Sequence, residues 1–237
     1  LLDIQSKEDY TIDNNVGKNI SQDIAITGMA CRFPGHSNSL SEYWNTINEN
    51  TDCITKIPPD RFNVDDYFSE NREEHGKMYC KNLGSIDNIF DFDNKFFNIT
   101  KQEAISMDPQ QRHVLELSYE AIINAAESKD SLNDTITDVF IGIEWRDYTV
   151  SIKNLEDHNV YSALGNTHSA TSGRVSHFFN LKGSNMGIST ACSSSLVALD
   201  TACQNLKNNR SNYAIVGGVQ SITSPDAYVS TCKLNAL

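Results

Sequence analysis

Apolar and polar positions along the middle of the chain alternate in a way that predicts helices and strands in turn. Residues 107–127 carry apolar side chains at helical spacing, behind an Asp108 that can cap the helix and a Pro109 suited to its first turn. Further patterns predict helices at residues 168–179 and 192–209, and strands at residues 138–143, 185–189 and 213–219. Strands that alternate with helices are typical of an α/β fold with a parallel or mixed sheet.

The amino-terminal part of the chain shows a less regular pattern. Residues 1–22 are polar and have no sustained period, which predicts a polar linker or disordered arm. The apolar run at residues 24–27, followed by glycine, predicts a buried strand that runs into a turn. Residues 37–50 predict a helix behind a serine cap, whereas residues 51–100 are aromatic and acidic and predict irregular loops with short turns.

Composition excludes several classes of function. An apolar fraction of 39% predicts a folded chain with polar loops, and a net charge of -12 argues against binding to nucleic acid. No apolar run reaches the length of about 18 residues that suggests a membrane span, and no signal peptide is evident, so a cytoplasmic location is expected. Six cysteines are dispersed without metal-binding spacing, which favours reduced thiols: they stand at positions 31, 53, 80, 192, 203 and 232.

The stretch STACSSSLVALD, residues 189–200, places Cys192 among small hydroxyl residues directly ahead of an apolar helix. Free N–H groups and the positive end of the helix dipole favour the thiolate, which is the nucleophilic form. The same N–H groups could stabilise an oxyanion on an attacked thioester carbonyl. A second interpretation stays open, because a cysteine in such a place is more often a packing residue. Cys203 illustrates that case and is expected in the core.

Several separated motifs, read together, resemble one known family. The stretches IAITGMACRFPG, IPPDRF, DPQQRHVLELSYEA, TACSSSLVALDTACQNL and AIVGGV follow one another over about residues 23–237. In order and spacing they resemble the N-terminal half of the β-ketoacyl synthase (ketosynthase) domain of modular type I polyketide synthases. Residues 23–237 are therefore expected to be a truncated ketosynthase domain, and the leucine at position 1 suggests a piece of a longer polypeptide.

The resemblance implies a thiolase-like layered fold, of which this chain would form the first half of the αβαβα arrangement, and a homodimer. It also implies an acyltransferase in which Cys192 accepts an acyl chain from the phosphopantetheine arm of an acyl carrier protein. A malonyl-type thioester then loses carbon dioxide and forms a carbon–carbon bond, as in polyketide or fatty-acid chain extension. The backbone N–H of Cys192 would be one oxyanion donor. No directly bound cofactor or metal is expected.

The sequence departs from the family pattern at several places. Ser189 stands where the family usually has aspartate, and Asp200 where histidine is frequent. The two later histidine motifs that assist decarboxylation are absent, and only His168 is considered as a residue that could line the acyl site. All six histidines precede Cys192, at positions 36, 75, 113, 158, 168 and 177.

These departures leave two hypotheses. The first is the N-terminal half of an active ketosynthase, although the fragment alone is not expected to be competent for condensation. The second is a catalytically inactive ketosynthase remnant or scaffold. A papain-like protease is disfavoured because no histidine follows Cys192. Without the second half of the family fold, an exposed sheet edge or face is expected.

Two further positions carry structural expectations. Arg174 is expected either to form an ion pair near the active site or to lie on the surface. Gly217 and Gly218 are expected to end a strand where another part of the backbone approaches closely. The acidic composition itself gives no docking surface for a carrier protein.

Overall fold

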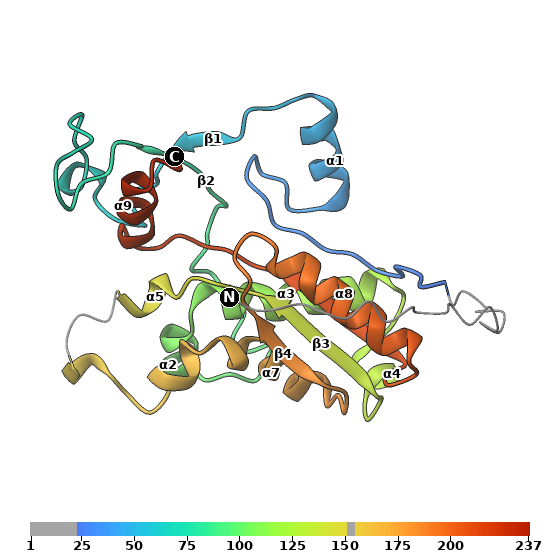
Figure 1. The fold of residues 1–237 in the computed structure, drawn as a ribbon. Coiled ribbons are helices and arrows are strands. Elements are labelled where there is room, and N and C mark those ends of the chain that lie inside the picture. The colour runs from blue at the N-terminus through green and yellow to red at the C-terminus, as the bar shows by residue number, and fades with distance from the viewer. Residues whose placement is uncertain (1–22, 151–154) are drawn as a thin grey trace, which may run out of the picture.

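A computed structural model describes residues 23–150 and 155–237, and at its centre lies a parallel sheet of three strands (Figure 1). The strands are β3 (Thr137–Gly142), β4 (Asn185–Ile188) and β5 (Tyr213–Gly218), in the order β4-β3-β5. Both neighbours of β3 run parallel to it. The predicted α/β class and the three strands are confirmed, whereas the prediction for residues 1–22 lies outside the described residues.

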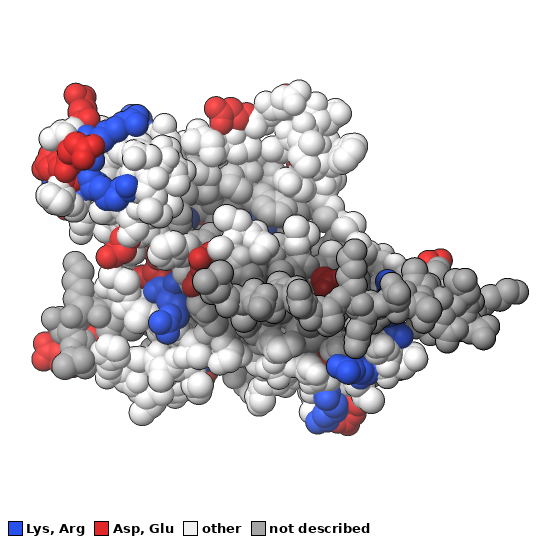
Figure 2. Space-filling model, viewed as in Figure 1, with Lys and Arg blue, Asp and Glu red and all other residues white. Residues whose placement is uncertain are grey.

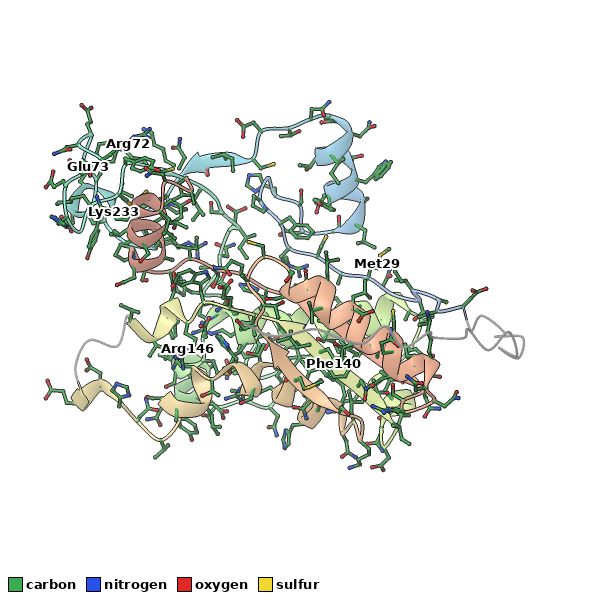
Figure 3. All side chains as sticks on the ribbon, in the orientation of Figure 1. Met29, Arg72, Glu73, Phe140, Arg146 and Lys233 are labelled. Carbon is green, nitrogen blue, oxygen red and sulfur yellow. The ribbon has the colours of Figure 1, made fainter. Side chains whose placement is uncertain are left out.

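The central strand β3 is buried on both faces, which explains why its sequence reads as one apolar run. Val139 and Ile141 belong to a core cluster with side chains of the helices on one face. Phe140, labelled in Figure 3, points to the opposite face and packs with Ala198 and Ala202. The alternation of strand side chains therefore divides the core into two layers.

Three helices cover the sheet. On one face α7 (His168–Phe179) packs against β3 and β4, and α3 (Pro109–Asn124) packs on the outer side of α7. On the other face α8 (Ser194–Lys207) packs against β3 and β5. All three helices are predicted by the sequence, and α8 begins two residues later than expected.

The start of α3 follows the capping expectation. The Asp108 side chain accepts a hydrogen bond from the backbone N–H of Gln110, at 2.9 Å, and Pro109 occupies the first helical position. The whole first turn and a half is buried, although most of its residues are polar: Gln110, Gln111, Arg112 and His113. Those side chains need partners inside the protein, and they find them in neighbouring loops.

Residues 40–84 and the chain's last helix form a separate layer, at the top of Figure 1. It holds α1 (Leu40–Asn48), which Ser39 caps, and an antiparallel pair of β1 (Ile54–Lys56) and β2 (Asn82–Gly84). The pattern did not predict this pair, because each strand has only three residues and none of them is fully buried. Tyr228 of α9 (Asp226–Lys233) donates to the Asn82 carbonyl at 2.7 Å and so ties the helix to β2.

Short elements complete the chain. They are α2 (Lys101–Ser106), α4 (Lys129–Leu132), α5 (Asp147–Val150), α6 (Ser162–Gly165) and 3₁₀ turns at Val64–Asp66 and Leu155–Asp157. Over residues 23–150 and 155–237, no helix has both the length and the apolar character needed to cross a membrane.

The predicted buried strand at residues 24–27 is wrong. The segment has no strand structure, and the Ile26 side chain is 73% exposed. Instead, Gly28 lies against α3, where an added Cβ would come within 2.1 Å of the Ala121 carbonyl oxygen. Apolar residues can form a strand only where another strand pairs with them, and none of the described strands lies beside this segment.

Candidate active site

The site lies where the three parallel strands end. The register places Gly142 opposite both Ile188 and Gly218, so the loops after the strands leave the sheet at one edge. Catalytic and binding groups in open α/β sheets lie at this carboxyl edge. Cys192 follows β4 there and is exposed, as expected for a thiol that meets a substrate.

The turn before α8 holds Cys192 in a defined conformation. Ala191 has a φ of 55°, in the left-handed region that few non-glycine residues adopt. The Ser194 hydroxyl donates to the Ala191 carbonyl at 2.6 Å and accepts from the Thr190 backbone N–H at 2.9 Å. Ser193 donates to the Thr190 carbonyl at 2.7 Å. The small hydroxyl residues around the cysteine therefore stabilise an unusual turn.

Two glycines allow the start of α8 to lie directly on the sheet. A Cβ on Gly142 would come within 2.6 Å of the Ser195 nitrogen, and one on Gly218 within 2.8 Å of the Ser195 Cβ. Neither distance is possible for a real side chain. The expected close approach is confirmed at Gly218, whereas a Cβ on Gly217 would meet only the Ile141 side chain, at 3.3 Å. The approach at Gly142 is one that the sequence did not reveal.

The amino terminus of α8 leaves main-chain donors free near the thiol. Within the described part of the chain, neither Cys192 nor Ser193 has a hydrogen bond from its backbone N–H. Ser193 takes the cap position but makes no side-chain cap bond. Free N–H groups at a helix start carry partial positive charge, which favours a thiolate and an oxyanion.

Of the six histidines, His168 lies at this edge. It is the first residue of α7, and a Cβ on Gly187 of β4 would come within 2.8 Å of its carbonyl oxygen. Burial lowers the pKa of His168, and the positive charge of Arg146 lowers it further, while a bond to the Trp145 carbonyl opposes both. The imidazole is therefore neutral at neutral pH. Its Nε2 is buried without a partner among the described residues.

The other histidines lie elsewhere. His113 is buried in α3, where Nε2 donates to the Ile89 carbonyl at 3.0 Å. His36 is exposed and lies 2.6 Å from an Asp87 oxygen. His75, His158 and His177 are exposed.

The buried glutamines of α3 fix the loops that surround the site. The Gln110 side chain donates to the Trp145 carbonyl at 2.8 Å, after β3, and accepts from the Ser221 N–H at 3.3 Å, after β5. Gln111 donates to the Leu164 carbonyl at 2.9 Å and accepts from Arg174 at 2.9 Å. The DPQQR motif thus orders backbone segments that are distant in sequence, a role that its letters alone did not indicate.

Asp147 is a second buried connection between the same two loops. It is 3% exposed, in a place where burial raises the pKa of its carboxyl to about 6. The backbone N–H groups of Ser224 and Thr223 act in the opposite direction and lower that pKa. Its Oδ2 atom has no partner in the described structure. No pattern in the sequence pointed to this residue.

Arg174 forms the expected ion pair, with Glu103 at 2.6 Å. The pair lies in the wall of a mostly apolar cavity of about 300 Å³, together with residues such as Phe97 and Phe178. Leu164, which follows β3, also lines this cavity, whereas Cys192 and its neighbours do not. The ion pair is therefore confirmed, but it belongs to a different region from Cys192.

Cys203 does not lie in the core as expected. It is only partly buried and belongs to none of the apolar clusters. The buried face of α8 is formed by Ala198 and Ala202, and the next residue along a helix points about 100° away from that face. None of the six cysteines, all of which lie in the described residues, forms a disulfide.

The surface carries no continuous basic area on the face drawn in Figure 2. At the end that holds β2 and α9, blue and red atoms occur together, and a separate small blue group lies near α5. Four cations of the first region, Arg72, Lys77, Lys81 and Lys233, contact backbone carbonyls or aromatic rings. They stand among acidic residues, so this region has no excess of positive charge.

Comparison with known proteins agrees with this geometry. The family model described as "Beta-ketoacyl synthase, N-terminal domain" matches residues 21–237. The chain belongs to the β-ketoacyl synthase family. Two solved ketosynthases have the same thiolase-like fold, of which this ketosynthase chain forms the first half.

The first of these structures is the ketosynthase from module 6 of the bacillaene synthase of Bacillus subtilis 168. It has a TM-score of 0.80 and 37% identity over 89% of this chain and 34% of its own. The second is the oxazolomycin ketosynthase domain OzmH KS7 of Streptomyces albus JA3453, with a TM-score of 0.80 and 29% identity over 88% of this chain and 36% of its own.

The sequence relatives are large synthases. A phenolphthiocerol/phthiocerol polyketide synthase protein of Mycobacterium tuberculosis is 37% identical over 219 residues, which is 92% of this chain and 12% of the relative. The cyclo-acetoacetyl-L-tryptophan synthase of Aspergillus oryzae is 41% identical over 90% of this chain and 6% of its own length. The ketosynthase chain thus spans a small part of each relative.

Proposed function

We propose that the chain supplies the nucleophile of a polyketide-type ketosynthase, and that Cys192 carries the growing acyl chain as a thioester. The observation that carries this proposal is the exposed thiol of Cys192 at the start of α8, beside free backbone N–H groups. Ketosynthase relatives with the same fold support the reaction class.

The first step is acyl transfer. The Cys192 thiolate attacks the carbonyl carbon of an acyl thioester on the phosphopantetheine arm of an acyl carrier protein. A new carbon–sulfur bond forms to Cys192, the bond to the arm breaks, and the arm's thiolate leaves and takes up the proton that Cys192 gave up. The free N–H groups at the start of α8 stabilise the negative charge on the carbonyl oxygen between these events.

The second step is decarboxylative condensation. A malonyl-type thioester loses carbon dioxide, its α-carbon forms a bond to the acyl carbonyl, and the Cys192 thiolate leaves. This reaction extends a polyketide or a fatty-acid chain. The chain does not contain the two histidine motifs of the family, and His168 is neutral and lies on α7, so groups outside this chain are needed to assist decarboxylation.

The absent histidines favour one alternative, a catalytically inactive remnant or scaffold. Such a protein could keep the thiol and the fold but would not extend a chain. Acylation of Cys192 without condensation, even in the complete natural polypeptide, would support that alternative.

We also propose a homodimer, in which the free edge of β4 takes part. Val139 and Ile143 donate to the carbonyls of Ser184 and Ile188, so the residues between, Asn185 and Gly187, direct their N–H and C=O groups away from β3. An exposed strand edge of this kind can pair with another chain. The six reduced cysteines fit a cytoplasmic location.

Replacement of Cys192 tests the proposed function. In Cys192→Ala we expect no covalent acylation by an acyl-pantetheine thioester, whereas Cys203→Ala, which changes a thiol on α8, should be acylated like the wild type. Intact-mass spectrometry measures the added acyl mass. Acylation of Cys192→Ala at the wild-type rate would rule out the covalent role.

A further inference from the structure

Arg146 lies at the same sheet edge as Cys192. It stands four residues after Gly142 at the end of β3, and Cys192 stands four residues after Ile188, the residue of β4 that pairs with Gly142. Figure 3 labels Arg146 on the segment that joins the end of β3 to α5. Arg146 and Cys192 therefore lie the same number of residues beyond the paired ends of two neighbouring parallel strands.

The Arg146 side chain is exposed. Within residues 23–150 and 155–237, its guanidinium makes neither a hydrogen bond nor an ion pair. Two buried or half-buried arginines, by contrast, form ion pairs with carboxylates: Arg32 with Glu120 and Arg174 with Glu103. Arg146 is therefore an exposed cation at the sheet edge that holds Cys192, and within the described residues it has no carboxylate partner.

The residues on both sides of Arg146 are held in place by contacts with other segments, which fixes the backbone from which the guanidinium extends. The Gln110 side chain donates to the Trp145 carbonyl at 2.8 Å, and the Asp147 side chain is buried. Tyr148 donates to the Ile105 carbonyl at 2.7 Å and lies 3.4 Å from an Arg112 nitrogen. In residues 145–148, three neighbours are anchored and the arginine side chain is left available.

A neighbouring group points to the same chemistry. The positive charge of Arg146 acts on His168, whose imidazole is held neutral and whose Nε2 has no partner in the described part of the chain. Because the imidazole is neutral, it neither adds a second positive charge nor cancels the charge of the Arg146 guanidinium. Because the neighbouring Asp147 carboxyl is buried, the exposed Arg146 guanidinium is the charged group of residues 145–148 that is accessible to a negatively charged group of a substrate.

We infer that Arg146 is an anion-recognising residue of the acyl site, which binds an oxyanion carried by the thioester substrate. The anion is either the phosphate of the phosphopantetheine arm or the carboxylate of a malonyl-type thioester. Arginine suits both because its planar fork of donors matches phosphate and carboxylate oxygens. The inference rests on the proposed function, since it assumes that Cys192 meets such thioesters.

The test compares Arg146→Gln with the wild type on matched thioesters, in the complete natural polypeptide. To test for the phosphate, kcat/KM for acylation of Cys192 is measured with butyryl-phosphopantetheine and with butyryl-pantetheine, which lacks the phosphate. To test for the carboxylate, malonyl-pantetheine and acetyl-pantetheine are compared as inhibitors of that acylation. Arg146→Lys keeps the charge, and Arg72→Gln removes an exposed arginine far from the site.

Recognition of phosphate predicts that Arg146→Gln lowers kcat/KM about tenfold for the phosphopantetheine thioester only. Recognition of carboxylate predicts an inhibition constant about tenfold higher for malonyl-pantetheine only. Arg146→Lys keeps the positive charge and should therefore retain most of the wild-type recognition of the anion. Arg72→Gln should resemble the wild type.

Equal effects of Arg146→Gln on all four thioesters, or none on any, would overturn the inference. A change confined to the oligomeric state would overturn it as well, because it would assign Arg146 to a contact between copies. If wild-type Cys192 accepts no acyl group from any thioester, the proposed function itself fails.

Discussion

At the residue scale, the most informative group is the buried Asp147 carboxyl. Its pKa of about 6 exceeds the ordinary value of 3.8, so the folded chain binds this proton more tightly than the unfolded chain does. Its contribution to the free energy of unfolding is therefore full below about pH 4 and is lost as the pH rises through about 6. Above that pH the loops after β3 and β5 hold a buried negative charge.

Asp147→Asn should remove this pH dependence. Between about pH 4 and pH 7, the free energy of unfolding should fall less in the variant than in the wild type. We expect a difference on the order of 2 kcal/mol, because each pKa unit corresponds to about 1.4 kcal/mol and solvent screens part of the charge. Urea denaturation at several pH values measures the difference. Asp200→Asn, on an exposed part of α8, should keep the wild-type slope, and an equal slope in Asp147→Asn would contradict the role of burial.

Sequence reasoning at this scale found the cysteine and missed the groups around it. Cys192 stands in a run of small hydroxyl residues before a helix, and this local pattern alone predicts a thiol at the start of a helix. Arg146 and Asp147 follow a strand with no distinctive pattern, and their environment comes from Gln110, Thr223 and Ser224, which are distant in sequence. Such environments arise only when the chain folds.

At the element scale, the position of α8 depends on the two glycines below its first turn. Gly142→Ala would bring a Cβ within 2.6 Å of the Ser195 nitrogen, and the helix start would have to move away from the sheet. We expect a loss of about 1–3 kcal/mol in the free energy of unfolding, as overpacking usually causes, and slower acylation of Cys192.

Gly173→Ala in α7 is the matched control, since the nearest heavy atom to its Cβ would be Asn185 Oδ1 at 4.0 Å. Alanine is the better helix former, so this variant should be as stable as the wild type or about 1 kcal/mol more stable. Urea denaturation compares the two. Equal free energies of unfolding for Gly142→Ala and Gly173→Ala would contradict the prediction, because the start of α8 would then move away from the sheet without loss of stability.

The elements that the sequence predicted are those with strong periodic patterns. Helices α3, α7 and α8 and the three central strands combine a repeated apolar spacing with caps or glycines, so their local and tertiary preferences agree. The run at residues 24–27 has strand character but no described strand beside it, and β1 and β2 are too short to show a pattern. Whether such segments pair depends on tertiary contacts rather than on their own residues.

At the scale of the whole molecule, many apolar side chains remain at the surface. Leu196 of α8 is 68% exposed and Trp44 of α1 is 67% exposed, and the chain spans 34% of the bacillaene ketosynthase. The alternation of helices and strands predicted the layered core, but it did not predict which apolar side chains lie at the surface. Such exposed apolar area supports the proposal that the working ketosynthase includes further protein surface.

The free edge of β4 gives a prediction about assembly. Asn185→Pro removes an N–H that points away from β3, so the ladder inside the sheet should keep its hydrogen bonds while pairing with a second copy is blocked. We expect a dimeric wild type and a largely monomeric variant by analytical ultracentrifugation, with thermal unfolding as a check on the fold. A variant that stays dimeric would exclude the β4 edge from the interface.

The proposed nucleophilic role of Cys192 rests on its exposed thiol in the turn before α8, and the reactivity of all six thiols can be compared in one experiment. The protein is alkylated with a small amount of iodoacetamide at neutral pH, and peptide-resolved mass spectrometry follows all six cysteines. We predict that Cys192 is modified first and well ahead of the partly buried Cys53, Cys80 and Cys203. Earlier modification of Cys203, or of the buried Cys31, would contradict this prediction.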